Sequence, residues 1–149
     1  MMNSNLARLA LSAVLALAPA GMTAERAHAV EPGTVELTFQ VGERRGAIMV
    51  ALFDSEAGYD KNAPAHATRV PVGEAPLKAI FPGLRPGRYA AKSFHDVDSD
   101  GAMNANMFGI PTEPIGFSNN APPRFGPAPW QAAAFEVGVE GAAQTITLR

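Results

Sequence analysis

The chain contains no cysteine among its 149 residues, which excludes a disulfide framework and any chemistry that requires a thiolate. Aromatic residues make up only 7% of the chain, with a single tryptophan. The net charge is only −2, so nothing in the composition points to nucleic acid or to an anionic membrane surface. The chain must therefore fold on its apolar core or on a bound ion.

The first 29 residues have the three parts of a secretory signal peptide. Arg8 provides the positive start, residues 9–17 form an apolar run, and Ala27-His28-Ala29 fits the small-x-small pattern of a signal-peptidase site. The run is shorter than the ~20 apolar residues of a membrane-spanning helix. We expect cleavage after Ala29 and export to the periplasm or the medium. Residues 30–149 then form one domain of ordinary size, with no membrane span after cleavage.

The remainder of the chain predicts an all-β fold. In residues 35–41, apolar and polar side chains alternate as in a half-buried strand. Further short strands are expected at residues 46–53, 70–72, 77–81, 88–95, 135–140 and 145–148. Residues 54–68 are interpreted as a long polar connection. About seven strands with turn signals between them indicate a single antiparallel β-sandwich, Ig-like or transthyretin-like, with a small barrel as the alternative.

Residues 96–131 form a long irregular loop in this prediction, rich in Gly, Pro and Asn. Loops beyond about 12–15 residues are usually functional or disordered. The apolar content of this one, which includes Phe117, Phe125 and Trp130, argues against disorder. We expect the loop to pack back on the sandwich.

The loop opens with Asp96, Asp98 and Asp100, followed by Gly101. This is the spacing of the first half of an EF-hand-type calcium loop, in which a glycine permits the sharp turn. The further ligands we predict are the backbone carbonyl of Ala102 and the side chains of Asn104, Asn106 and Glu113. Since every ligand is a hard oxygen, calcium is the expected ion.

The pattern departs from an EF-hand in two respects. Met107 stands where the bidentate glutamate belongs, and a strand rather than a helix precedes the loop. We therefore expect weak affinity, with Kd about 10⁻⁴–10⁻³ M. The alternative is an acidic turn whose carboxylates cap backbone amides, with Lys92 or Arg88 of the preceding strand compensating the charge.

His95 could act as a general base or a transition-metal ligand, or it could be a strand-end histidine bonded to loop backbone. Neighbouring strand residues face opposite ways, so Asp96 is badly placed to orient it. No set of nucleophile, base and orienting group is visible.

Residues 118–120, Ser-Asn-Asn, are expected to bond to loop backbone or to the aspartate loop. Trp130, Phe125 and Phe117 could form an aromatic platform or plug the core.

The segment from Leu84 to Asn120 resembles the bacterial domain-of-unknown-function 2141 (DUF2141) family. The resemblance lies in Phe-His-Asp at 94–96, Asp-Gly at 100–101, Gly-Ile-Pro at 109–111 and Gly-Phe-Ser-Asn-Asn at 116–120. It implies a small exported protein and carries no activity. The Leu84-x-Pro86-Gly87-x-Tyr89 entry into a strand is also similar, more loosely, to transthyretin-like and collagen-adhesin B-type modules. That similarity implies a sandwich, in some members with a calcium loop.

These observations favour a non-enzymatic exported module, binding or structural, whose Asp-rich loop is stabilised by calcium. Its expected partner is a protein or carbohydrate of the cell envelope or the extracellular space. One alternative is a metal-dependent periplasmic hydrolase that uses His95 and the aspartate loop. A second is a metal-free module that binds carbohydrate or peptide through Trp130 and Phe125.

Overall fold

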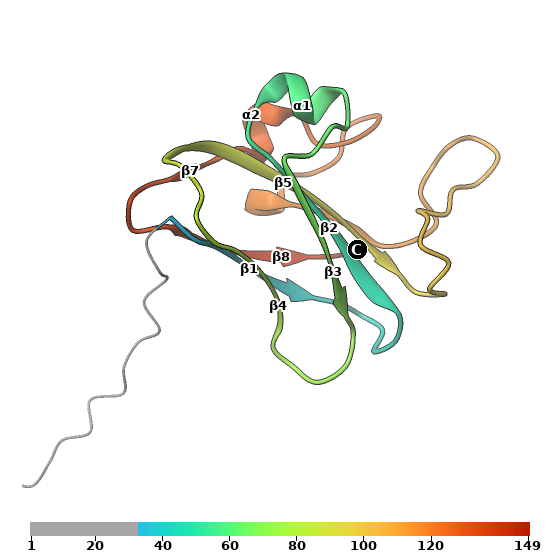
Figure 1. Cartoon of the computed structure of the whole chain (residues 1–149). Coiled ribbons are helices and arrows are strands. Elements are labelled where there is room, and N and C mark those ends of the chain that lie inside the picture. The colour runs from blue at the N-terminus through green and yellow to red at the C-terminus, as the bar shows by residue number, and fades with distance from the viewer. Residues whose placement is uncertain (1–32) are drawn as a thin grey trace, which may run out of the picture.

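Figure 1 shows a computed structural model of the chain, which describes residues 33–149. Two β-sheets face each other, and this confirms the predicted β-sandwich. The three-stranded sheet has the order β4 (Leu77–Phe81), β1 (Val35–Gln40), β8 (Ala142–Thr147). The five-stranded sheet has the order β3 (His66–Pro71), β2 (Ala47–Phe53), β5 (Gly87–Asp96), β6 (Ile115–Phe117), and β7 (Phe135–Val137) pairs with the start of β5. The expected signal peptide, residues 1–29, lies outside the described residues.

One strand pair departs from the expected antiparallel pattern. β1 and β8 are parallel, with Val35 opposite Ala142 and Gln40 opposite Thr147, whereas the other paired strands are antiparallel. The chain reaches β8 from β7, which belongs to the opposite sheet. The tight turn between them, in which Gly138 is bridged to Gly141, does not set the direction of β8 relative to β1, and side-chain alternation carries no information about strand direction.

The main core lies between the two sheets. The buried side chains of β1, namely Val35, Leu37 and Phe39, belong to one cluster with Ile48 and Leu52 of β2. Full burial of one such side chain contributes about 1.5–3 kcal/mol to folding. The alternation seen in the sequence of β1 is therefore the pattern that this core requires.

A second, smaller core covers the outer face of the five-stranded sheet. Two short helices, α1 (Glu56–Asp60) and α2 (Trp130–Ala133), lie side by side over it (Figure 1). The ring of Tyr59 packs edge-on against Phe53 and Trp130, with centroids 5.2 and 5.6 Å apart. Trp130 is only 6% exposed and Phe125 is fully exposed. The predicted aromatic platform is therefore not formed, because Trp130 belongs to this core.

The polar connection expected over residues 54–68 contains regular structure. Ser55 caps α1, its hydroxyl oxygen accepting a hydrogen bond from the Gly58 amide at 3.3 Å. β3 begins at His66, earlier than the expected residue 70, and most of its side chains are exposed. An edge strand of this kind lacks the apolar alternation on which the prediction relied.

The segment after β5 is also less irregular than expected. It contains β6, a 3-10 helix η1 (Ser118–Asn120) and the start of α2. The Asn119 amide donates to the carbonyls of Ala132 and Ala134, and the Asn120 amide donates to the carbonyl of Thr145. These side chains do satisfy backbone groups, but those of α2, its C-terminal end and β8 rather than of the loop or the aspartates. Within residues 33–149, no helix has the length and apolar character that crossing a bilayer would require.

Candidate metal centre

The end of β5 provides the base of the aspartate loop. His95 and Asp96 are its last residues and lie opposite Ile48 and Ala47 of β2. Gly46, just before β2, packs directly on this strand end, since a Cβ there would overlap the Asp96 carbonyl oxygen. The φ of Gly46 is +75°, a conformation that favours glycine. The close approach of this turn therefore holds the strand end in place.

Asp96 organises the first turn of the loop. It is 1% exposed, and its two carboxylate oxygens accept hydrogen bonds from the amides of Asp100 and Gly101, each at 3.1 Å. Ser99 and Gly101 have φ of +64° and +81°, which curls the backbone around the carboxylate. This coil is the geometry expected for the opening of an oxygen-ligand loop.

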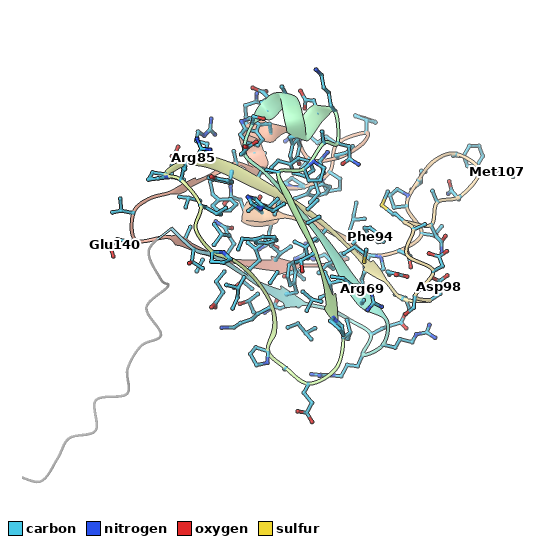
Figure 2. The ribbon with its side chains drawn as sticks, viewed as in Figure 1. Arg69, Arg85, Phe94, Asp98, Met107 and Glu140 are labelled. Atoms are coloured by element: carbon cyan, nitrogen blue, oxygen red, sulfur yellow. The ribbon has the colours of Figure 1, made fainter. Side chains whose placement is uncertain are left out.

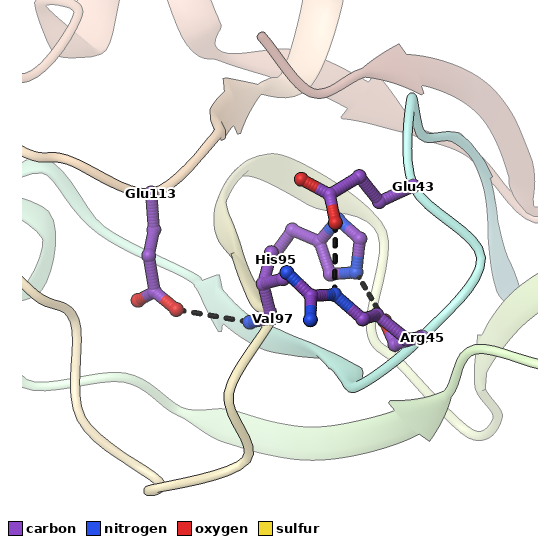
Figure 3. A network of polar contacts seen from close by, with 5 residues as sticks. All are labelled: Glu43, Arg45, His95, Val97 and Glu113. Carbon is purple, nitrogen blue, oxygen red and sulfur yellow. Dashed lines mark hydrogen bonds and ion pairs between the residues drawn. The ribbon is translucent and has the colours of Figure 1, made fainter.

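Glu113 closes the loop from its other end. It is 9% exposed, and Oε1 accepts from the Val97 amide at 2.9 Å, as Figure 3 shows. Oε2 accepts from the Asn104 amide at 3.1 Å. One carboxylate therefore joins the start and the middle of the loop to the segment that leads into β6.

Three of the predicted ligands come together. Asp96, Asp98 and Glu113 each offer a carboxylate oxygen, and these oxygens lie within 4.8 Å of one another. Asp98 is exposed and accepts a hydrogen bond from the Asn104 side-chain amide at 2.9 Å. The cluster of three carboxylates is therefore open to solvent at Asp98 and buried at Asp96 and Glu113.

The other predicted ligands make different contacts. A carboxylate oxygen of Asp100 accepts from the Ala102 amide at 2.8 Å. The Asn106 side-chain oxygen accepts from the amides of Phe108 and Ile110. Asn104 contributes donors to Asp98 and Glu113. A role for Asp100, Ala102, Asn104 and Asn106 as ion ligands stays a prediction.

No ion pair that the structure shows in residues 33–149 compensates these carboxylates. Lys92, one expected compensator, donates instead to the Tyr59 carbonyl at 2.6 Å and lies over the Tyr59 ring. Arg88, the other, pairs with Glu136. Carboxylates this close repel one another, and burial of two of them raises the cost. The set is therefore electrostatically suited to a cation.

The amide contacts leave capacity for such an ion. Each carboxylate oxygen carries two lone pairs, and a backbone amide uses one of them. Hard oxygen ligands of this kind suit calcium, which takes six to eight of them and leaves the rest to backbone or water. The donor set fits the ion that the loop spacing predicts.

His95 lies on the opposite face of β5 and is not part of this group. It is fully buried, and Nε2 is 2.6 Å from the Arg45 carbonyl oxygen (Figure 3). A carbonyl only accepts, so Nε2 carries the proton. Nδ1 has no hydrogen-bond partner within the described part of the chain. His95 is therefore a strand-end histidine bonded to backbone, but to the turn between β1 and β2 rather than to the aspartate loop.

Two surface hollows in residues 33–149 lie away from the carboxylates. One, of about 390 Å³, is lined by Asp54, His66 and residues 83–89. The other, of about 330 Å³, is lined by residues 38–41, Arg44 and residues 75–77. The carboxylate group therefore lies on a surface loop, apart from both hollows.

Comparison with known proteins gives one match. A family model described as an uncharacterised protein conserved in bacteria, DUF2141, matches residues 35–147. No curated protein and no solved structure matches the chain, and the looser similarity to transthyretin-like modules is therefore not confirmed. The match covers every strand of the sandwich together with the aspartate loop, and the chain accordingly belongs to the DUF2141 family.

Proposed function

We propose that this protein is an exported, non-enzymatic β-sandwich module whose Asp96–Glu113 loop is held in shape by a bound calcium ion. The observation that carries the proposal is the convergence of three carboxylate oxygens, from Asp96, Asp98 and Glu113, within 4.8 Å. Two of these side chains are buried. The ion would stabilise the protein because it binds only the folded loop.

A structural ion fits this site better than a catalytic one. The side chain best suited to acid–base chemistry, His95, faces away from the carboxylates. A catalytic metal keeps an open position beside a substrate cavity, and neither hollow touches the carboxylate group. These observations support the structural role over the metal-dependent hydrolase.

The test is a thermal melt of the protein in EDTA and in about 5 mM calcium, near the upper end of weak extracellular affinities. We expect Tm to rise by roughly 5 °C with calcium. Asp98→Asn removes the exposed carboxylate and should abolish the rise while leaving the melt in EDTA little changed. Asp60→Asn alters an exposed aspartate of α1 and should keep the full rise.

A third variant, Asp100→Asn, separates two ligand sets. If the rise persists, the ion uses Asp96, Asp98 and Glu113, as the converging oxygens suggest. If the rise disappears, Asp100 turns toward the ion on binding, as in an EF-hand. A wild-type melt that is the same in EDTA and in calcium would refute the proposal and leave a self-capped acidic turn.

A further inference from the structure

The hairpin that extends from the aspartate loop, residues 103–111, exposes a cluster of apolar side chains at its tip. Met107 is 90% exposed, Phe108 79% and Ile110 59%, and Met103 is 48% exposed. Figure 2 shows Met107 on the loop that projects farthest from the two sheets on that side. Contiguous exposed apolar residues on a soluble domain mark an interaction site more often than chance.

The hairpin is an ordered structure. Backbone hydrogen bonds join Asn106 N to Ile110 O, Gly109 N to Asn106 O and Thr112 N to Asn104 O, each at 2.9 Å. Ala105 and Pro111 form an isolated antiparallel bridge. Gly109 has a φ of +74°, which suits the turn. The apolar side chains are therefore presented on a fixed scaffold, and little order has to be gained on binding.

Four backbone amides at the tip bond within the hairpin. The side-chain oxygen of Asn106 accepts from the Phe108 amide at 2.9 Å and from the Ile110 amide at 3.1 Å. The amides of Asn106 and Gly109 bond inside the hairpin, and Pro111 has no amide hydrogen. Transfer of backbone into an apolar medium is costly only where such groups lack partners. These four amides therefore add no such cost when the tip enters an apolar medium.

The charge pattern defines the surface that it would enter. Residues 101–112 contain no Asp, Glu, Lys or Arg, whereas Asp98, Asp100 and Glu113 lie at the base of the hairpin. An uncharged tip complements hydrocarbon, and an acidic base would be repelled by anionic headgroups. We propose that the hairpin 103–111 inserts into the outer part of an uncharged or zwitterionic lipid surface and docks the protein there. This inference goes beyond the calcium proposal and does not depend on it.

The experiment uses the lack of cysteine in this chain. Met107→Cys carries an environment-sensitive fluorophore at the tip, and Glu140→Cys carries the same label at the opposite end of the sandwich (Figure 2). With phosphatidylcholine vesicles in EDTA, we expect a blue shift and quenching by brominated lipid at position 107 and neither at position 140. Equal responses at the two positions, or none at position 107, would overturn the proposal.

Substitution at the tip provides the second arm. The double variant Phe108→Ser with Ile110→Ser keeps Asn106 and Gly109, which shape the hairpin. It should lower the vesicle partition coefficient about tenfold. Val139→Ser, at an exposed apolar residue away from the tip (68% exposed), should change it little. Equal flotation of all three proteins would assign binding to another part of the protein and reject the hairpin.

A protein partner is the competing possibility. If vesicles leave the position 107 label unchanged but the protein self-associates with rising concentration, and the double variant does not, the tip is a protein contact. That result would overturn the lipid proposal.

The last arm uses vesicles that contain phosphatidylglycerol, with and without calcium, to test the effect of lipid charge. In EDTA, stronger binding to the phosphatidylglycerol vesicles than to phosphatidylcholine vesicles would contradict the expected repulsion between the acidic base of the hairpin and anionic headgroups.

Discussion

At the scale of single residues, Glu113 has two roles that can be separated. Its two carboxylate oxygens accept hydrogen bonds from the amides of Val97 and Asn104. One of these oxygens also belongs to the cluster formed with Asp96 and Asp98. Glu113→Gln replaces one acceptor with an NH₂ donor that faces an amide. We expect this variant to lower the free energy of unfolding in EDTA by about 1–3 kcal/mol, measured by urea unfolding.

The calcium response distinguishes the two roles further. Glu113→Gln should lose both stability in EDTA and the rise with calcium, whereas Asp98→Asn should lose only the rise. The difference follows from burial, since Glu113 is 9% exposed and Asp98 is exposed. A Glu113→Gln protein as stable in EDTA as the wild type would show that its two amide contacts do not hold the loop.

Tyr59 should make the fold sensitive to alkali. Burial, with a smaller effect of the Asp60 charge, raises the pKa of Tyr59 from 10.0 to about 12. Between these values the unfolded chain loses a proton that the folded chain retains, so stability falls as the pH rises through this window. Below pH 10 the group is protonated in both states and contributes no pH dependence.

Tyr59→Phe tests this prediction. We expect urea unfolding between pH 9 and pH 11.5 to show a shallower loss of stability in the variant than in the wild type. At pH 8 the variant should be less stable by about 1 kcal/mol, because the hydroxyl donates to the Ala128 carbonyl at 2.7 Å. Tyr89→Phe, which also removes a hydroxyl bonded to a carbonyl, controls for that loss at pH 8. If the free energy of unfolding fell equally with pH in the wild type and in Tyr59→Phe, the raised pKa of Tyr59 would not be the cause of the alkaline loss of stability.

At the scale of elements, the contact of the β1–β2 turn with the end of β5 positions the loop. Gly46→Ala would place a Cβ on the Asp96 carbonyl oxygen at a backbone φ of +75°. We expect a loss of more than about 2 kcal/mol of unfolding free energy and a smaller calcium-induced rise in Tm. Both follow from displacement of the strand end that carries Asp96.

Gly42→Ala is the matched control for this prediction. Gly42 lies in the same turn, and a Cβ there would meet nothing within 4 Å. Its stability should stay within about 0.5 kcal/mol of the wild type, as for ordinary surface substitutions. If Gly46→Ala were equally harmless, the turn would be free to move away from β5 without consequence for the loop.

At the scale of the whole molecule, export is the prediction that the N-terminus makes. Intact-mass spectrometry of the protein recovered from outside the inner membrane should give a chain that begins at Val30, after Ala27-His28-Ala29. Ala29→Arg should block cleavage, since a signal peptidase requires a small residue there. Recovery of the full-length chain from the cytoplasm alone would contradict export.

The whole fold also shows which parts of the sandwich were predictable. β1 and β4 have clear alternation and were predicted to within one residue. β3 is an exposed edge strand, and β6 has only three residues, so neither carries a periodic signal. The parallel pairing of β1 with β8 depends on contacts between the two ends of the domain, which no local pattern records.

By itself, the sequence determined the class of fold, the family and the candidate loop, because strand alternation, turn residues and aspartate spacing are local properties. Tertiary structure alone decided which of the predicted ligands bring their carboxylates together, namely Asp96, Asp98 and Glu113, and that Trp130 is core. These outcomes depend on which faces of distant segments meet. The same packing leaves the tip of the hairpin 103–111 apolar and exposed.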